Sequence, residues 1–339
     1  MKKKIISSLL SIAILSCSTT IHANENKIDA INKNVPIQVT RIDGSNRYET
    51  SIKTKEHLDI TNKAKNIVIA SGESFADALS GGLLASEYNC SLVLIKNNSS
   101  NDHLKDKSIF QNMDKIFVIG GTSTISDKTI QELGTKNVKR LSGKTRFETS
   151  YKVDDEIQNL IKIKNPDRGI YTDVIAVYDG YNFPDALAAV PFMYMYNSRP
   201  NTNYLSFYPD NVSPEGRKTG AVTLVFGGKS SVPEYRYEET RFAGKNRYET
   251  ATLIANGYKN ILGIDINKVI LVSGENYADA LSSTPIASME NAAILLSGSK
   301  KLNSYAKEFI LKNNIKDVII VGGENSISND VIKELKDIR

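Results

Sequence analysis

Three sequence motifs, here called landmarks, occur in the same order three times along the chain. This repetition constrains the fold more than any other feature. The first landmark is the pattern Arg-x-x-Gly-x-(Asn/Thr)-Arg-(Tyr/Phe)-Glu-Thr, which begins at Arg41, Arg140 and Arg241. These starting points are 99 and 101 residues apart in a chain of 339 residues. Such regular spacing predicts three copies of one structural unit, over residues 24–135, 136–236 and 237–339.

Each copy continues with two further landmarks. An apolar strand that leads into an Asp-Ala-Leu helix begins at Ile67, Val174 and Val269. A second apolar strand, which ends in a pair of glycines, begins at Ile116, Leu224 and Val318. Short β-rich runs that alternate with helical patterns are typical of βαβ units around a parallel sheet. The sequence therefore predicts an α/β fold of three Rossmann-like repeats with short parallel sheets, and it predicts an insertion in the middle copy within residues 161–171.

The first landmark also predicts the start of a helix. In each copy an Asn or Thr precedes a glutamate by three positions, as in a capping box. The pairs are Asn46 and Glu49, Thr145 and Glu148, and Asn246 and Glu249. We therefore expect these glutamates to cap helices rather than to catalyse a reaction.

The arginines inside this landmark, Arg47, Arg146 and Arg247, need a separate explanation. An arginine at the first helical position opposes the helix dipole, so another interaction must hold it there. Two hypotheses are open. Each guanidinium pairs with an acid across a repeat interface, or it faces an anionic ligand, which its forked donors suit.

The other landmarks favour structural roles over catalytic ones. Asp77, Asp185 and Asp279 follow Ser74, Asn182 and Asn276 by three positions, which again predicts helix caps. The glycine pairs fit neither of the common phosphate-loop motifs and predict turns. The histidines do not recur between copies and none lies near Cys90 in the sequence, so no zinc set or Cys-His dyad can be assembled. We expect no catalytic residues, no metal and no cofactor.

The N-terminus predicts a secretory signal peptide over residues 1–23. Lys2, Lys3 and Lys4 precede an apolar run that is too short to span a bilayer, and Ala23 provides a small residue for cleavage. Lipoprotein processing at Cys17 is a weaker alternative. Removal of the leader lowers the formal net charge from +5 to +2, so the global charge gives no indication of a nucleic-acid partner.

The three landmarks, above all NRYET, SGESFADAL and VIGGTSTIS, resemble the clostridial cell-wall-binding repeat of type 2. This family includes surface-layer and cell wall proteins of Clostridioides difficile. The resemblance covers about 300 of the 339 residues. It implies Toprim-like repeats packed as a pseudo-threefold unit. It also implies noncovalent attachment to an anionic, teichoic-acid-like secondary polymer of a Gram-positive cell wall, with no membrane span and no nucleic-acid partner.

The resemblance further implies a polymer-binding run of the Pro-Ile-Leu-Leu type after the Asp-Ala-Leu helix. The matching residues are Leu92, Val93 and Leu94 in the first copy, and Ile294, Leu295 and Leu296 in the third. In the middle copy the equivalent residues are 200–202, which read Pro-Asn-Thr, and the nearest apolar run is Tyr-Leu-Ser at 204–206. A structural alternative makes these runs central strands, with binding by the loops beyond them, such as Lys96 and Asn97 or Ser297 and Ser299. Arg47, Arg146 and Arg247 complete the candidate set.

The sequence therefore predicts a secreted, non-catalytic protein of the cell wall or surface layer, with other surface-layer proteins as further candidate partners. Two alternative functions stay open. One is a wall-acting hydrolase that uses acids such as Asp77 or Asp279, although no second paired carboxylate accompanies them. The other is a secreted adhesin or decoy that contacts host surfaces through 24–40 or the insertion in the middle copy.

Overall fold

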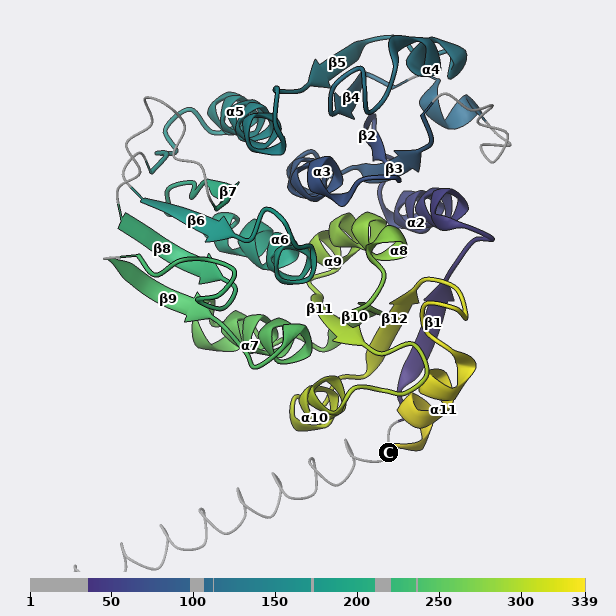
Figure 1. Ribbon diagram of the computed structural model, residues 1–339, viewed down its shortest axis with the longest axis vertical. Helices are drawn as coiled ribbons and strands as arrows, with labels where there is room; N and C mark the ends of the chain where they lie inside the picture. Colours follow the sequence, from purple (N-terminus) through teal and green to yellow (C-terminus); the bar gives the residue numbers. More distant parts are fainter. Residues whose placement is uncertain are drawn as a thin grey trace, which may run out of the picture.

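The computed structural model describes residues 36–97, 107–111, 113–171, 174–210, 221–235 and 237–338. The predicted leader, its cleavage point and Cys17 lie outside these ranges. Within them, three sheets of four parallel strands surround a central group of helices (Figure 1). The α/β class, the three short parallel sheets and the threefold arrangement are confirmed.

The twelve strands are divided equally among the three sheets. Sheet 1 has the order β3-β2-β4-β5, with β2 (Asn66–Ser71), β3 (Ser91–Ile95), β4 (Lys115–Ile119) and β5 (Val138–Leu141). Sheet 2 has the order β7-β6-β8-β9, with β6 (Val174–Tyr178), β7 (Phe207–Pro209), β8 (Ala221–Phe226) and β9 (Glu238–Phe242). Sheet 3 has the order β1-β12-β10-β11, with β1 (Gln38–Ile42), β10 (Lys268–Ser273), β11 (Ala293–Ser297) and β12 (Asp317–Val321).

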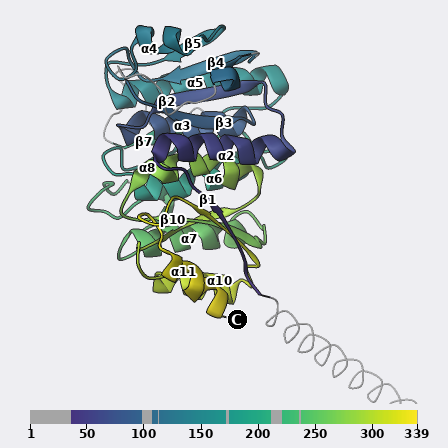
Figure 2. The same ribbon diagram turned by 90° about the vertical axis from the view of Figure 1, so that its right-hand side faces the viewer.

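Each sequence copy gives its first strand to the sheet of the preceding copy. The second copy begins with β5, which pairs with β4 of sheet 1, and the third begins with β9, which pairs with β8 of sheet 2. The first copy begins with β1, which pairs with β12 at the other end of the chain, from Gln38 beside Asp317 to Ile42 beside Val321 (Figure 1). In Figure 2, β1 (purple) runs beside the C-terminal elements (yellow). The exchange closes the three units into a ring, so the boundaries of the sequence copies are not the boundaries of the sheets.

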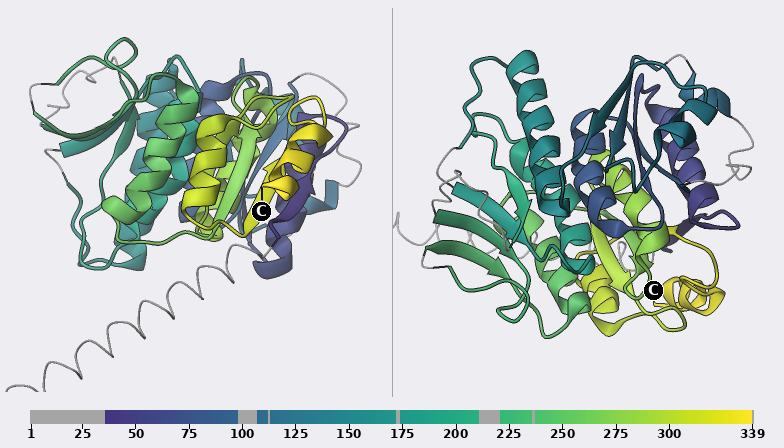
Figure 3. Two further views of the ribbon diagram at one scale, coloured as in Figure 1. Left: turned by 90° about the horizontal axis from the view of Figure 1, so that it is seen from below. Right: turned by 45° about the horizontal axis from the view of Figure 1, so that its top comes forward.

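The helices fill the centre of the ring and the seams between sheets (Figures 1 and 3). The central helices are α3 (Phe75–Glu87), α6 (Pro184–Asn197), α8 (Tyr277–Ala280), η2 (Leu281–Ser283) and α9 (Thr284–Met289). The helices at the seams are α2 (Arg47–Thr61), α5 (Arg146–Lys164) and α7 (Arg247–Asn260). The remaining helices are η1 (Lys107–Phe110), α4 (Asp127–Glu132), α10 (Ser304–Lys312) and α11 (Asn329–Asp337). Within the described ranges, none is long and apolar enough to cross a membrane.

The helix starts test the capping predictions. Asn46, Thr145 and Asn246 cap α2, α5 and α7 through their side chains, as predicted. Each partner glutamate accepts from the backbone N–H of the residue before the cap, as Glu49 does from Ser45 at 2.8 Å, and not from the cap itself. For the central helices only Asn276 acts as a side-chain cap. The predictions for Ser74 and Asn182 were wrong, since Ser74 makes no side-chain cap bond and α6 begins at Pro184, two residues after Asn182, with Phe183 at the cap position.

The insertion in the middle copy lengthens a helix at its C-terminal end. Helix α5 has 19 residues, whereas α2 and α7 have 15 and 14. The same copy also shifts its third strand. Tyr178 pairs with Pro209 as Ala70 pairs with Leu94, so the counterpart of the apolar run is 207–209. Neither 200–202 nor 204–206 occupies that position.

A buried carboxylate organises this part of the middle copy. Asp154 of α5 is 3% exposed and accepts hydrogen bonds from four side chains. The donors and distances are Tyr204 Oη at 2.8 Å, Ser206 Oγ at 2.8 Å, Tyr208 Oη at 2.7 Å and Gln158 Nε2 at 2.7 Å. Burial raises the pKa of Asp154, whereas these four hydrogen bonds lower it. The equivalent positions hold Lys55 and Ala255, so this network belongs to the middle copy alone.

Candidate functional site

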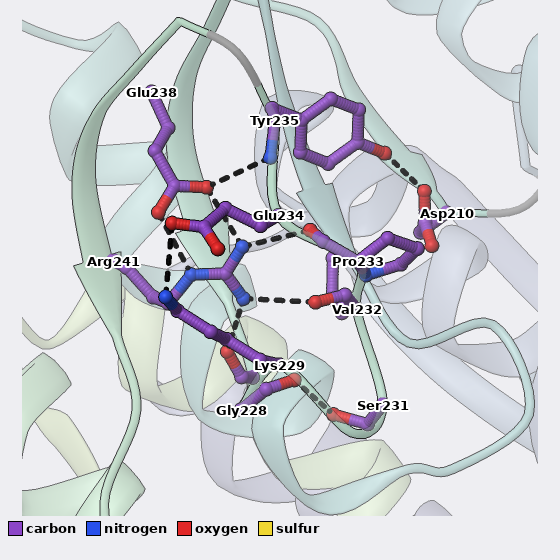
Figure 4. A network of polar contacts seen from close by, with 11 residues as sticks. Asp210, Gly228, Lys229, Ser231, Val232, Pro233, Glu234, Tyr235, Glu238 and Arg241 are labelled. Carbon is purple, nitrogen blue, oxygen red and sulfur yellow. Dashed lines mark hydrogen bonds and ion pairs between the residues drawn. The ribbon is translucent and has the colours of Figure 1, made fainter.

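The first arginine of each copy fixes the glycine-pair loop of the preceding sheet. The guanidinium of Arg241 donates to the carbonyl oxygens of Gly227 (2.9 Å), Val232 (3.0 Å) and Pro233 (2.8 Å), and it also contacts Glu238 at 2.7 Å (Figure 4). All of its directed donors are therefore used inside the protein. This arginine holds a loop, and it is not available to a ligand.

The other two copies use the same device. Arg41 donates to the carbonyl oxygens of Gly322 (2.6 Å) and Ile327 (2.7 Å), and Arg140 donates to that of Gly120 (2.8 Å). Gly120, Gly227 and Gly322 have φ of +107°, +136° and +127°, a region that disfavours residues with a Cβ. The glycine pairs are turns, as predicted.

The second arginine of each copy reaches the loop after the second strand of its own copy, which is β2, β6 or β10. Arg47 donates to the carbonyl oxygen of Gly72 at 2.5 Å, and Arg247 donates to that of Gly274 at 2.5 Å. Arg146 makes the equivalent bond to Gly180 at 3.1 Å. This bond holds an arginine at the first helical position despite the helix dipole.

Three aromatic rings meet where the three copies converge. Phe75, Phe183 and Tyr277 occupy the same position in each copy, directly before the central helix or at its first residue. Their ring centroids are 6.2 Å apart for Phe75 and Phe183, 5.5 Å for Phe75 and Tyr277, and 5.7 Å for Phe183 and Tyr277. These distances are typical of edge-on aromatic packing. The rings therefore mark the pseudo-threefold axis.

The three second arginines surround these rings. Each guanidinium lies over the ring of the preceding copy, with 5.7 Å between Arg47 and Tyr277, 5.8 Å between Arg146 and Phe75, and 5.8 Å between Arg247 and Phe183. We call these three arginines and three rings the axial cluster. All three arginines are half-buried residues. Three cations on one axis can bind a single anionic chain together.

The Asp-Ala-Leu aspartates lie behind the axial cluster. Burial raises the pKa of Asp77, whereas the charge of Arg146 and a hydrogen bond with Thr149 lower it. Burial also raises the pKa of Asp185 to about 6, with repulsion by Asp179 adding to the effect and Arg247 opposing it. The arginine of one copy thus attracts the aspartate of the preceding copy, which supports the hypothesis of pairing across the repeat interface.

Asp185 makes stability depend on pH. A carboxyl whose pKa rises on folding adds stability that is complete below the unfolded pKa of 3.8 and is lost as the pH rises through about 6. Moreover, among the described residues Asp185 Oδ1 has no hydrogen-bond partner. We expect Asp185→Asn to raise the free energy of unfolding at pH 8 by about 1–2 kcal/mol and to change it little at pH 4.5.

Urea unfolding at both pH values measures this effect. Asp337→Asn is the matched control, since it removes an equal charge from an exposed position in α11. An Asp185→Asn effect of the same size at pH 4.5 and pH 8 would show that the ionised carboxylate is not the cause.

The apolar runs do not contribute side chains to any surface. Leu92, Val93 and Leu94 are fully buried, and Ile294, Leu295 and Leu296 are at most 1% exposed. Strands β3 and β11 lie at the edges of their sheets, so the expectation of central strands was wrong. Helix α2 covers the edge of β3, where Leu94 N–H donates to Ser51 Oγ at 2.9 Å. These side chains therefore belong to the core and cannot contact a polymer directly.

The loops beyond these strands lie at the same edge of the sheets as the axial arginines. Lys96 follows β3 directly and is exposed. Gly72 N–H donates to the carbonyl oxygen of Ile95 at 3.0 Å, which places Lys96 beside the loop that Arg47 holds. The carboxyl ends of parallel strands are the usual ligand-binding edge of such sheets.

Sequence reasoning missed the aromatic part of the axial cluster. The signal was present, because all three copies carry Phe or Tyr two residues before the aspartate, at Phe75, Phe183 and Tyr277. Arg47, Arg146 and Arg247 were singled out correctly, but their convergence on one axis depends on the ring closure. Among the residues that the structure describes, no group of three His, Cys, Asp or Glu side chains could hold a metal ion.

Comparison with known proteins gives one family. The family model described as cell wall binding domain 2 matches the chain three times, over residues 41–130, 140–236 and 241–332.

Two curated proteins of Bacillus subtilis (strain 168) are similar over most of the chain. The N-acetylmuramoyl-L-alanine amidase LytC is 27% identical over 307 residues, which is 88% of this chain and 58% of that protein. The amidase enhancer is 28% identical over 308 residues, which is 88% of this chain and 40% of that protein. The chain thus spans about half the length of the curated relatives it matches.

Two solved structures share the fold. Cwp8 from Clostridium difficile superposes with a TM-score of 0.70 at 20% identity, over 94% of this chain and 54% of that one. Cwp6 from the same organism gives a TM-score of 0.68 at 19% identity, over 89% of this chain and 48% of that one.

Proposed function

Because the chain belongs to the cell wall binding domain 2 family, we propose that it attaches noncovalently to an anionic polymer of a Gram-positive cell wall and that the axial cluster is its binding site. The observation that carries this proposal is the convergence of Arg47, Arg146 and Arg247 around the three rings. Among the residues that the structure describes, each of these arginines donates to a single carbonyl, at Gly72, Gly180 or Gly274, which leaves guanidinium donors for phosphate or carboxylate groups.

The chemistry of the cluster fits a polymer that carries repeated negative charges. A guanidinium binds phosphate or carboxylate through two parallel hydrogen bonds, and such charge-assisted bonds are stronger than neutral ones. Three guanidiniums on one axis share a single chain, because successive anionic groups of the polymer can occupy successive arginines. The exposed Lys96 at the same edge adds a further cation.

We propose that this chain attaches without catalysing a reaction. The aspartates at the strand ends are occupied by the protein itself. Asp77 is 9% exposed and bonds with Thr149, and Asp279 Oδ2 accepts a hydrogen bond from Ser326 Oγ at 2.7 Å. A hydrolase of this type would need two carboxyl groups that both reach the substrate. The names of the amidase relatives describe proteins that are much longer than the region they share with this chain.

The proposed location is the outer surface. A signal peptide over residues 1–23, as the sequence predicts, would deliver the chain to the wall, where surface-layer proteins are candidate neighbours. The adhesin or decoy alternative has less support in the described part of the chain, since residues 38–40 of its candidate segment 24–40 pair with β12 inside sheet 3.

A pelleting experiment tests the proposal. Protein without residues 1–23 is mixed with washed walls and with walls from which the anionic polymer has been chemically removed. We expect the protein to sediment with the intact walls and to stay in solution with the stripped walls. Equal sedimentation with both would refute attachment through the polymer, and release of wall fragments in the same tubes would refute the non-catalytic role.

A further inference from the structure

One difference among the three corners of the axial cluster lies beside the glycine that each second arginine holds. The residue that follows the glycine held by each arginine is Glu73 in the first copy, Tyr181 in the second and Glu275 in the third. All three side chains are exposed at the carboxyl edge of their sheets. Burial raises the pKa of Tyr48 and Tyr248, and repulsion by Glu73 and Glu275 adds to the effect. At this position only the middle copy has an aromatic residue.

Tyr181 is held as an open aromatic platform. It is 59% exposed, although large aromatic side chains usually bury most of their surface. The guanidinium of Arg146 lies 5.4 Å from its ring centroid, and Phe147 packs edge-on against the ring at 5.7 Å and 70°. Its backbone N–H donates to Asp179 Oδ1 at 2.8 Å. Arg146 and Phe147 therefore hold the ring in its orientation, and the rest of its surface faces solvent.

The unusual third strand of the middle copy supports this loop. A Cβ at Gly180 would lie 2.8 Å from Pro209 Cβ and 2.8 Å from Phe147 Cε1, so the loop that carries Tyr181 rests directly on both. Pro209 belongs to the run 207–209 that replaces the aliphatic run of the other copies. The departure of the middle copy from the sequence pattern thus coincides with the corner where Tyr181 follows the glycine.

We propose that the middle corner is a saccharide subsite, in which Tyr181 stacks on a sugar ring of the wall polymer while Arg146 binds the neighbouring anionic group. This inference rests on the proposed function and names the chemistry that the site recognises, a glycan with pyranose or furanose rings next to phosphate or carboxylate. An aromatic ring offers an apolar face to the C–H groups of a sugar, and the tyrosine hydroxyl stays in water. Glu73 and Glu275 cannot stack in this way, and their charge weakens the attraction of Arg47 and Arg247 for an anion without removing it.

The inference predicts unequal effects of substitution at equivalent positions. Binding of purified wall polymer, measured by titration calorimetry, should weaken about three- to tenfold for Tyr181→Ala. Tyr181→Phe keeps the ring and should bind within about twofold of the unmodified protein. Tyr181→Glu should weaken binding more than Tyr181→Ala, and the difference between them should shrink at high salt, because it comes from charge repulsion. Conversely, Glu73→Tyr should strengthen binding.

Controls separate this inference from the proposed function. Tyr237→Ala removes a tyrosine that is 64% exposed next to the amino end of β9, at the opposite edge of sheet 2, and should leave affinity unchanged. If the unmodified protein does not bind the polymer, both the function and the subsite are refuted. If it binds and Tyr181→Ala binds equally well, the subsite alone is refuted. Polymer from which the anionic groups have been removed should bind weakly to the unmodified protein. It should bind still more weakly to Tyr181→Ala.

Discussion

We expect the variant in which Arg47, Arg146 and Arg247 are all replaced by Gln to bind purified wall polymer at least about a hundredfold more weakly than the unmodified protein. A hydrogen bond to a charged group contributes about 1.5–3 kcal/mol, so each lost arginine alone lowers the affinity by roughly tenfold or more. The three losses act on one site, because the guanidiniums surround one group of rings. Titration calorimetry with the purified polymer measures the change.

A variant with the same loss of charge elsewhere is the control. Lys128, Lys307 and Lys333 are exposed on α4, α10 and α11, and their replacement by Gln also removes three positive charges. We expect this control to bind within about threefold of the unmodified protein, since exposed charges beyond a Debye length are largely screened. Equal weakening in both variants would show that net charge, and not the axial cluster, governs binding. Thermal unfolding confirms that the arginine variant is folded.

The largest expected effect on stability comes from Asp154. Replacement by Ala leaves the buried donors of Tyr204, Ser206 and Tyr208 without their acceptor. Buried polar groups without partners cost about 1–3 kcal/mol each when they cannot reach water, and broken buried networks are among the most destabilising substitutions. We expect Asp154→Ala to lower the free energy of unfolding by about 3–5 kcal/mol, measured by urea unfolding.

Asp154→Asn separates hydrogen bonding from packing, because it keeps the volume and one acceptor oxygen. It should cost less than Asp154→Ala. A loss below about 1 kcal/mol for Asp154→Ala would mean that the four donors find other partners and that the network does not hold the middle copy together.

The sequence predicted the elements of the fold better than their partners. Apolar runs such as 67–70 and 116–119 identified strands that are fully buried, and the Asn46 and Glu49 pair identified a helix start. The exchange of first strands could not be predicted in this way. Strand β1 buries only Ile42 fully, and nothing in its five residues indicates that its partner is β12, at the other end of the chain.

The same limit applies to the candidate site. A repeat pattern shows that Arg47, Arg146 and Arg247 are equivalent, and their unfavourable place in the helix indicated that something holds them. Their convergence depends on the closed ring, which only the tertiary structure shows. The apolar runs illustrate the opposite error. Their strand character was predicted correctly, but complete burial at a covered sheet edge excludes the contact with a ligand that the resemblance implied.

The most direct test of the account is a titration of the protein with purified wall polymer, followed through the NMR signals of the arginine side chains. Arg47, Arg146 and Arg247 should shift together and saturate at the same polymer concentration. Arg41, Arg140 and Arg241, whose donors are bonded within the glycine-pair loops, should stay unchanged. Binding of the polymer without any change in the signals of the three axial arginines would contradict the central claim.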